Sequence, residues 1–100
     1  MQTVVETRLF SRHAGMLLTT SERQDLIAFL AAHPLAGDVI PGTGGIRKLR
    51  WQARGKGKSG GARVIYYAYD TWQPIYALLI YGKGETANLS PDEKRTLTIL

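Results

Sequence analysis

Apolar residues recur at helical spacing between positions 19 and 33, and this is the clearest periodic pattern in the chain. The pattern predicts an amphipathic helix. Thr19–Glu22 or Ser21–Gln24 forms a capping box at its start. Pro34 ends the helix, because the residue before a proline avoids the α conformation. The apolar stripe consists of Leu26, Ile27, Leu30 and Ala31.

Three later segments have the period of strands. Residues 46–53 alternate, with Leu49, Trp51 and Ala53 on one face and Lys48, Arg50 and Gln52 on the other. This alternation predicts a half-buried strand with a cationic face. Residues 62–69 are rich in Ile, Val and Tyr, which favours a second strand. Residues 74–81 are apolar on both faces and predict a central strand.

The remaining segments complete the element order. Residues 3–7 predict a short first strand, and residues 9–18 a short helix that is broken near Gly15. Residues 38–45 form a turn-rich connector. A last helix starts at Ser90, because Ser90 caps it, proline suits the first helical position and Glu93 closes a capping box.

This order predicts one domain over residues 1–100 with an α+β fold. Strands at hairpin spacing pair antiparallel. We therefore expect a small antiparallel sheet, with the N-terminal helices packed on one face and a short C-terminal helix. The other face, which would carry Lys48, Arg50 and Arg63, is expected to be open.

The charge is concentrated in one part of the chain. The net charge is +5, but residues 39–69 contain no acidic residue and seven basic ones. The rest of the chain has six basic and eight acidic residues and sums to −2. A localised positive field attracts polyanions such as nucleic acids. The alternative is a solvated cationic face with no ligand.

Several other classes of chemistry find no support. The chain has no cysteine, which excludes disulfides and thiolate metal sites and favours a cytoplasmic location. His13 and His33 lack metal-ligand spacing, so we expect no metal and no cofactor. Gly57-Lys58-Ser59 resembles the end of a P-loop, but Gln52 stands where its first glycine belongs. The N-terminal residues contain no apolar run as long as the core of a signal peptide, and no apolar run in the chain is as long as a membrane span.

The basic residues fall around one predicted hairpin turn. Arg54, Lys56, Lys58 and Arg63 flank this turn, and Lys83 follows the next strand. Side chains on neighbouring strands converge, and converging cations stabilise a phosphate whose charge grows during a reaction. Crowded ammonium groups also lower one another's pKa, which would let a lysine accept a proton. The nearby tyrosines and tryptophans could stack on bases, although most are expected to pack in the core.

The motifs IRKLRW, RGKGKSGGARVIYY, PIYALLIYGKGE and NLSPDEK resemble the RelE/ParE superfamily of bacterial toxins. The resemblance covers residues 5–100 and is closest to the HigB-like branch of type II toxin–antitoxin systems. It implies a microbial-ribonuclease-like α+β fold. It also implies a metal-independent endoribonuclease that cleaves mRNA in the ribosomal A site. In this chemistry the RNA 2′-hydroxyl attacks the adjacent phosphate and leaves a 2′,3′-cyclic phosphate.

By motif position, the resemblance carries the family's catalytic cluster onto Arg54, Lys56, Arg63 and Lys83. Arg63 would stabilise the pentavalent phosphate, and either Lys56 or Lys83 would transfer protons. The sequence departs from the family pattern at Gly84, where relatives have an arginine, and no tyrosine follows Tyr81. The acid–base roles therefore stay open. RNA binding is expected from Lys48, Arg50 and Lys58.

The resemblance also implies partners. These are a cognate antitoxin with a helix-turn-helix domain similar to HigA, the ribosome with its mRNA, and DNA only through the antitoxin complex; no membrane is involved. Two alternatives stay open: a ParE-like inhibitor of DNA gyrase, and a non-catalytic module that binds RNA or the ribosome.

Overall fold

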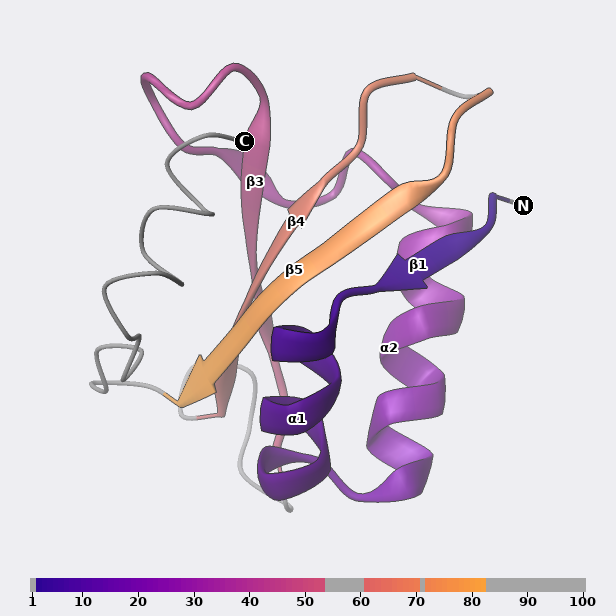
Figure 1. Ribbon diagram of the computed structural model, residues 1–100, viewed down its shortest axis with the longest axis vertical. Helices are drawn as coiled ribbons and strands as arrows, with labels where there is room; N and C mark the ends of the chain where they lie inside the picture. Colours follow the sequence, from indigo (N-terminus) through magenta and orange to yellow (C-terminus); the bar gives the residue numbers. More distant parts are fainter. Residues whose placement is uncertain (1, 54–60, 71, 83–100) are drawn as a thin grey trace.

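The computed structural model describes residues 2–53, 61–70 and 72–82. Within them two helices lie against a five-stranded sheet (Figure 1), which confirms the predicted α+β fold. The helices are α1 (Arg8–Leu17) and α2 (Thr20–Ala32). The strands are β1 (Val4–Glu6), β2 (Asp38–Val39), β3 (Ile46–Trp51), β4 (Ala62–Tyr67) and β5 (Ile75–Gly82).

The sheet has the strand order β1-β5-β4-β3-β2. The β3–β4 and β4–β5 pairs are antiparallel, as the hairpin spacing predicts. The β1–β5 pair is parallel, so the sheet is mixed and not wholly antiparallel as expected. The reason is connectivity: β1 and β5 are joined through both helices and the other strands, and only short loops enforce antiparallel pairing.

Two local predictions need correction. Helix α1 is continuous through Gly15, which is exposed and has open space around its Cα, so this glycine does not break it. The predicted connector over residues 38–45 contains β2, a two-residue edge strand paired with β3. The predicted C-terminal helix from Ser90 lies outside the described residues.

The N-terminus of α2 has the predicted capping box. The Thr19 hydroxyl accepts from the Glu22 N–H at 3.1 Å, and the Glu22 carboxylate accepts from the Thr19 N–H at 2.9 Å. The helix ends at Ala32, with His33 as the cap before Pro34. Leu26 and Leu30 of the predicted stripe are fully buried.

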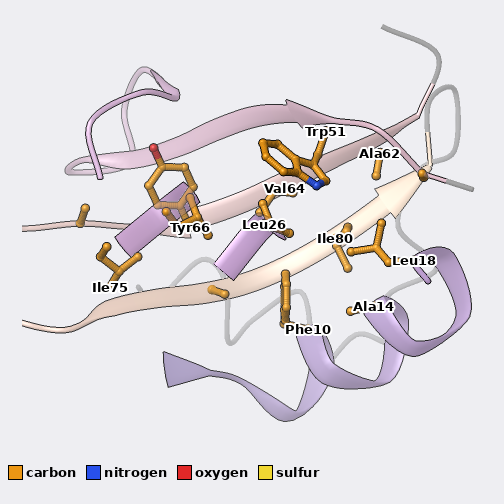
Figure 2. Packing of buried hydrophobic residues seen from close by; sticks show 14 residues of the cluster. Phe10, Ala14, Leu18, Leu26, Trp51, Ala62, Val64, Tyr66, Ile75 and Ile80 are labelled. Atoms are coloured by element: carbon orange, nitrogen blue, oxygen red, sulfur yellow. The ribbon is translucent and has the colours of Figure 1, made fainter. Parts of the chain in front are cut away.

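The main core lies between the helices and one face of the sheet (Figure 2). Figure 2 shows Phe10 of α1 and Leu26 of α2 pointing toward Val64 and Ile80 on the sheet. Each of these four side chains has no exposed surface. Both helices thus cover the same face of the sheet, as predicted.

The opposite face is less open than the sequence indicates. Its centre holds a second apolar cluster of Ile46, Ile65, Leu78 and Leu79, all buried. Leu9, from the start of α1, packs against this cluster. Solvent-exposed polar groups are therefore confined to parts of this face and do not fill it.

A β-bulge on β5 changes the direction of its side chains. Ile65 pairs with Leu79 and Tyr66 with Ala77, so Leu78 is the extra residue. β1 pairs with β5 only before the bulge. From the bulge onward, side chains from the N-terminal cap of α1 and from α1 itself contact the backbone of β5. The Thr7 hydroxyl donates to the Leu78 carbonyl at 2.9 Å, and His13 Nδ1 lies 3.3 Å from the Ile80 carbonyl.

A buried tyrosine joins the central strand β4 to the loop after α2. The hydroxyl of Tyr66, which is fully buried, accepts from the Gly37 N–H at 2.8 Å. A Cβ at Gly37 would lie 2.9 Å from the Tyr66 ring, so only glycine allows this approach. The Arg47 guanidinium donates to the Gly37 carbonyl at 2.7 Å. Burial raises the pKa of Tyr66, while the Gly37 hydrogen bond and Arg47 act in the opposite direction.

Replacing Tyr66 with phenylalanine removes this acceptor and leaves a buried N–H without its partner. We expect Tyr66→Phe to lower the free energy of unfolding by about 1–3 kcal/mol, measured by urea denaturation. The matched control is Tyr69→Phe, because Tyr69 is 65% exposed and its hydroxyl should contribute less than about 0.5 kcal/mol. Equal losses in the two variants would contradict the assigned role of Tyr66.

The raised pKa of Tyr66 also predicts a pH dependence. Its folded pKa lies above the unfolded value of about 10. Its contribution is therefore complete below about pH 10 and is lost as the pH rises through the folded pKa. The stability difference between the wild type and Tyr66→Phe should narrow as the pH rises above about 10. A difference that stays constant over this range would show that Tyr66 ionisation is not linked to unfolding.

Candidate nucleic-acid interface

Two arginines face each other across the β3–β4 pair. Arg50 and Arg63 are directly opposite in the register, and Arg63 is in turn opposite Tyr81 of β5. Their strand neighbours Leu49, Trp51, Ala62 and Val64 pack in the core on the helix side, so these three side chains lie on the other face. We call Arg50, Arg63 and Tyr81 the arginine row.

The two arginines differ in how firmly they are held. Arg50 is exposed, whereas Arg63 is half-buried and its Nη1 lies 3.4 Å from the Ala62 carbonyl. Like charges directly opposite on a sheet destabilise it. A bound anion between the two guanidinium groups would remove this repulsion, and planar guanidinium groups suit phosphate oxygens.

Three strand ends meet beside the arginine row. Ala62 pairs with Trp51 on one side and with Gly82 on the other. Gly61 makes this junction possible, because a Cβ there would clash with the Trp51 carbonyl and lie 2.8 Å from the Ala53 nitrogen. The indole of Trp51 donates to the Glu22 carbonyl at 3.3 Å and so ties β3 to α2.

Three of the seven predicted site residues can be placed. Lys48, Arg50 and Arg63 lie on the sheet face opposite the helices, as predicted, and Lys48 is exposed opposite Ile65. The other four, Arg54, Lys56, Lys58 and Lys83, lie outside the described residues.

Arg47 belongs to the same basic segment but has a different role. It lies opposite Tyr66, and its Nη1 donates to the carbonyls of Leu35 and Gly37 at 3.3 and 2.7 Å. Its Nε is buried without a hydrogen-bond partner. Arg47 therefore holds the loop before β2 and does not belong to the arginine row.

The tyrosines and tryptophans differ in burial, and Tyr67 and Tyr81 are half-buried. Tyr66 and Trp51 are buried, in agreement with the expected packing role. Tyr69, Trp72 and Tyr76 are exposed. Tyr81 is one of the tyrosines that could stack on bases, and it is not among the seven predicted site residues. Tyr81 lies beside Arg63 because of the bulge at Leu78. The residues around Leu78 have no pattern in the sequence that predicts this bulge.

The histidines have structural neighbours. His13 contacts the Ile80 carbonyl, and the His33 ring lies 5.0 Å from the Phe29 ring. Among the described residues no group of three or more His, Cys, Asp or Glu side chains could hold a metal ion. None of the helices in the described part of the chain is long and apolar enough to cross a membrane.

A hollow of about 510 Å³ lies elsewhere, between β1 and α2. Its lining includes the ion pair of Arg23 and Glu6, whose atoms are 2.8 Å apart, and apolar residues such as Val4 and Ile27. None of the three predicted site residues that the structure describes lines it. The hollow is therefore separate from the arginine row.

No protein-family model matches this chain.

If the two arginines repel each other, replacing the exposed one should stabilise the fold. We expect Arg50→Gln to raise the free energy of unfolding by about 0.2–1 kcal/mol at low salt. High salt should reduce this gain by screening. Urea denaturation at two salt concentrations measures the effect, with Arg8→Gln on α1 as the control for loss of one exposed charge. A loss of stability in Arg50→Gln alone would show that no such repulsion exists.

Proposed function

We propose that this protein is the toxin of a type II toxin–antitoxin system and acts as a ribosome-dependent mRNA endoribonuclease. The observation that carries the proposal is the pair of directly opposed arginines on the sheet face away from the helices. The motif resemblance to HigB-like members of the RelE/ParE superfamily supplies the reaction. The α+β fold is compatible with it, although a fold alone does not define an activity.

In the proposed reaction the RNA 2′-oxygen attacks the adjacent phosphorus. The new bond joins the 2′-oxygen to phosphorus, and the bond from phosphorus to the 5′-oxygen of the next nucleotide breaks. The 2′-hydroxyl proton passes to a basic group, and the leaving 5′-oxygen takes up a proton. The products are a 2′,3′-cyclic phosphate and a free 5′-hydroxyl, so no external reactant is needed.

Arg63 is the residue proposed to stabilise the phosphate as its negative charge grows. It is half-buried on β4, and a guanidinium on a central strand is held in place before the reaction begins. Arg54 belongs to the same cluster. Lys56 or Lys83 would transfer the protons, while Lys48, Arg50 and Lys58 would bind the RNA backbone.

The proposed partner is a cognate antitoxin with a helix-turn-helix domain. An acidic segment of this antitoxin would lie on the cationic face and block RNA. The complex would bind DNA through the antitoxin. Both steps follow from the family resemblance and from the charge of residues 39–69, which contain seven basic residues and no acidic one.

Mapping mRNA 5′ ends after induced expression tests the proposal. The wild type should create new 5′-hydroxyl ends in translated mRNA. Arg63→Ala and the more conservative Arg63→Gln should reduce cleavage by at least about 100-fold, the usual effect of losing one transition-state donor. Circular dichroism checks that both variants fold, and Arg8→Ala on α1 is the matched control for loss of an exposed arginine.

Two results would overturn the proposal. Unchanged mRNA ends would leave a non-catalytic module that binds RNA or the ribosome. Induction of the DNA-damage response without mRNA cleavage would assign the protein to gyrase inhibition.

A further inference from the structure

Three tyrosines gather at the turn between β4 and β5, on the face that carries the arginine row. Tyr67 is directly opposite Tyr76, and the rings of Tyr67 and Tyr69 are stacked, with centroids 6.4 Å apart. Tyr69 is 65% and Tyr76 38% exposed. We call these three residues the turn-end tyrosines. On the same turn, Trp72 is 92% exposed.

The backbone that presents these rings is held by hydrogen bonds. Asp70 Oδ1 accepts from the Trp72 and Gln73 N–H groups at 2.8 and 2.9 Å. The Gln2 side chain donates to the Gln73 carbonyl at 2.8 Å and to the Asp70 carbonyl. These hydrogen bonds use backbone groups and the side chains of Asp70 and Gln2, and they do not involve the aromatic rings of Tyr69 and Trp72.

The turn-end tyrosines and the arginine row share a face, and Tyr67 and Arg63 are four residues apart along β4. At about 3.4 Å per residue this separation is about 14 Å. Lys48 lies between them on the neighbouring strand, since β3 places Ile46 opposite Tyr67, Lys48 opposite Ile65 and Arg50 opposite Arg63. Asp38 of β2 is opposite Lys48 and lowers the positive charge there. The positive charge on this face is therefore stronger at the arginine row than at Lys48.

We infer that the turn-end tyrosines stack on unpaired bases of single-stranded RNA whose phosphates lie along Lys48 and the arginine row. This inference rests on the proposed function and extends its substrate site to the far end of the sheet. Flat aromatic rings beside a track of cations are the combination that single-strand binding proteins use. A duplex would not fit this mode, because its bases are already stacked and paired.

The alternative ligand for the turn-end tyrosines is a protein partner. The chemistry of the side chain at position 69 distinguishes RNA from a protein. Stacking needs a flat ring, so phenylalanine can replace tyrosine but leucine cannot. An apolar contact with a protein would tolerate both phenylalanine and leucine at this position. The informative variants are therefore Tyr69→Leu and Tyr69→Phe. Tyr69 is largely exposed, so both should fold.

The experiment measures the affinity of the purified protein for a short unstructured RNA labelled with fluorescein, at several salt concentrations. Tyr69→Leu should bind at least about five-fold more weakly, the lower end of what one stacked base contributes. Tyr69→Phe should bind as the wild type does. The salt dependence should be unchanged in Tyr69→Leu and shallower in Arg50→Gln, because only the latter loses a phosphate contact. Met16→Ala, at another exposed apolar residue, is the control.

Wild-type RNA affinity in Tyr69→Leu would overturn the inference. So would a Tyr69→Leu variant that keeps its RNA affinity but no longer binds the antitoxin, since the face would then belong to a protein. If RNA binding depends on Tyr69 but the protein does not cleave mRNA in cells, the nuclease proposal is wrong and this inference stands. If mRNA cleavage depends on Arg63 but RNA binding does not depend on Tyr69, this inference is wrong and the nuclease proposal stands.

Discussion

The burial of alternate residues on β4 is the constraint on which the rest of this structure depends. Val64 and Tyr66 have no exposed surface and face the helices. The strand alternates, so Arg63 and Tyr67 must face the other side. A slip of one residue would place Arg63 in the apolar core and Val64 in its place on the other face. The same free energy that forms the core therefore holds the candidate arginine in position.

Two glycines let neighbouring elements approach β4 closely. Gly61 allows the start of β4 to approach the end of β3, and Gly37 allows the loop before β2 to contact the Tyr66 ring. In both places a side chain would meet atoms that cannot easily move. Arg47 adds hydrogen bonds to this loop. These contacts fix the outer half of the sheet, where Lys48 and Arg50 lie.

The arginine row brings two like charges together on neighbouring strands. Two like charges directly opposite each other on a strand pair repel each other. At the other end of the same face, Tyr69 and Tyr76 are exposed to solvent. Features that oppose local stability concentrate at functional sites, because binding the ligand compensates for them.

Local patterns in the sequence determined much of the architecture. The capping box at Thr19, the stop at Pro34 and the alternation through Lys48 and Arg50 each involve residues close together in the chain. For that reason they predicted α2, β3 and the face that carries the cations. The antiparallel pairing of β3, β4 and β5 followed from short connections, which leave no other choice.

Long-range pairing decided the rest. The parallel β1–β5 pair joins residues about seventy positions apart, and the two-residue β2 exists only because β3 is beside it. The buried centre of the second face also depends on neighbours that alternation along one strand does not reveal. The bulge at Leu78 is the clearest case. Tyr76 and Tyr81 are five residues apart and would face opposite sides of a regular strand, but the extra residue brings both onto the arginine face. Strand period is a property of the sequence, whereas a break in that period depends on how the partner strand pairs.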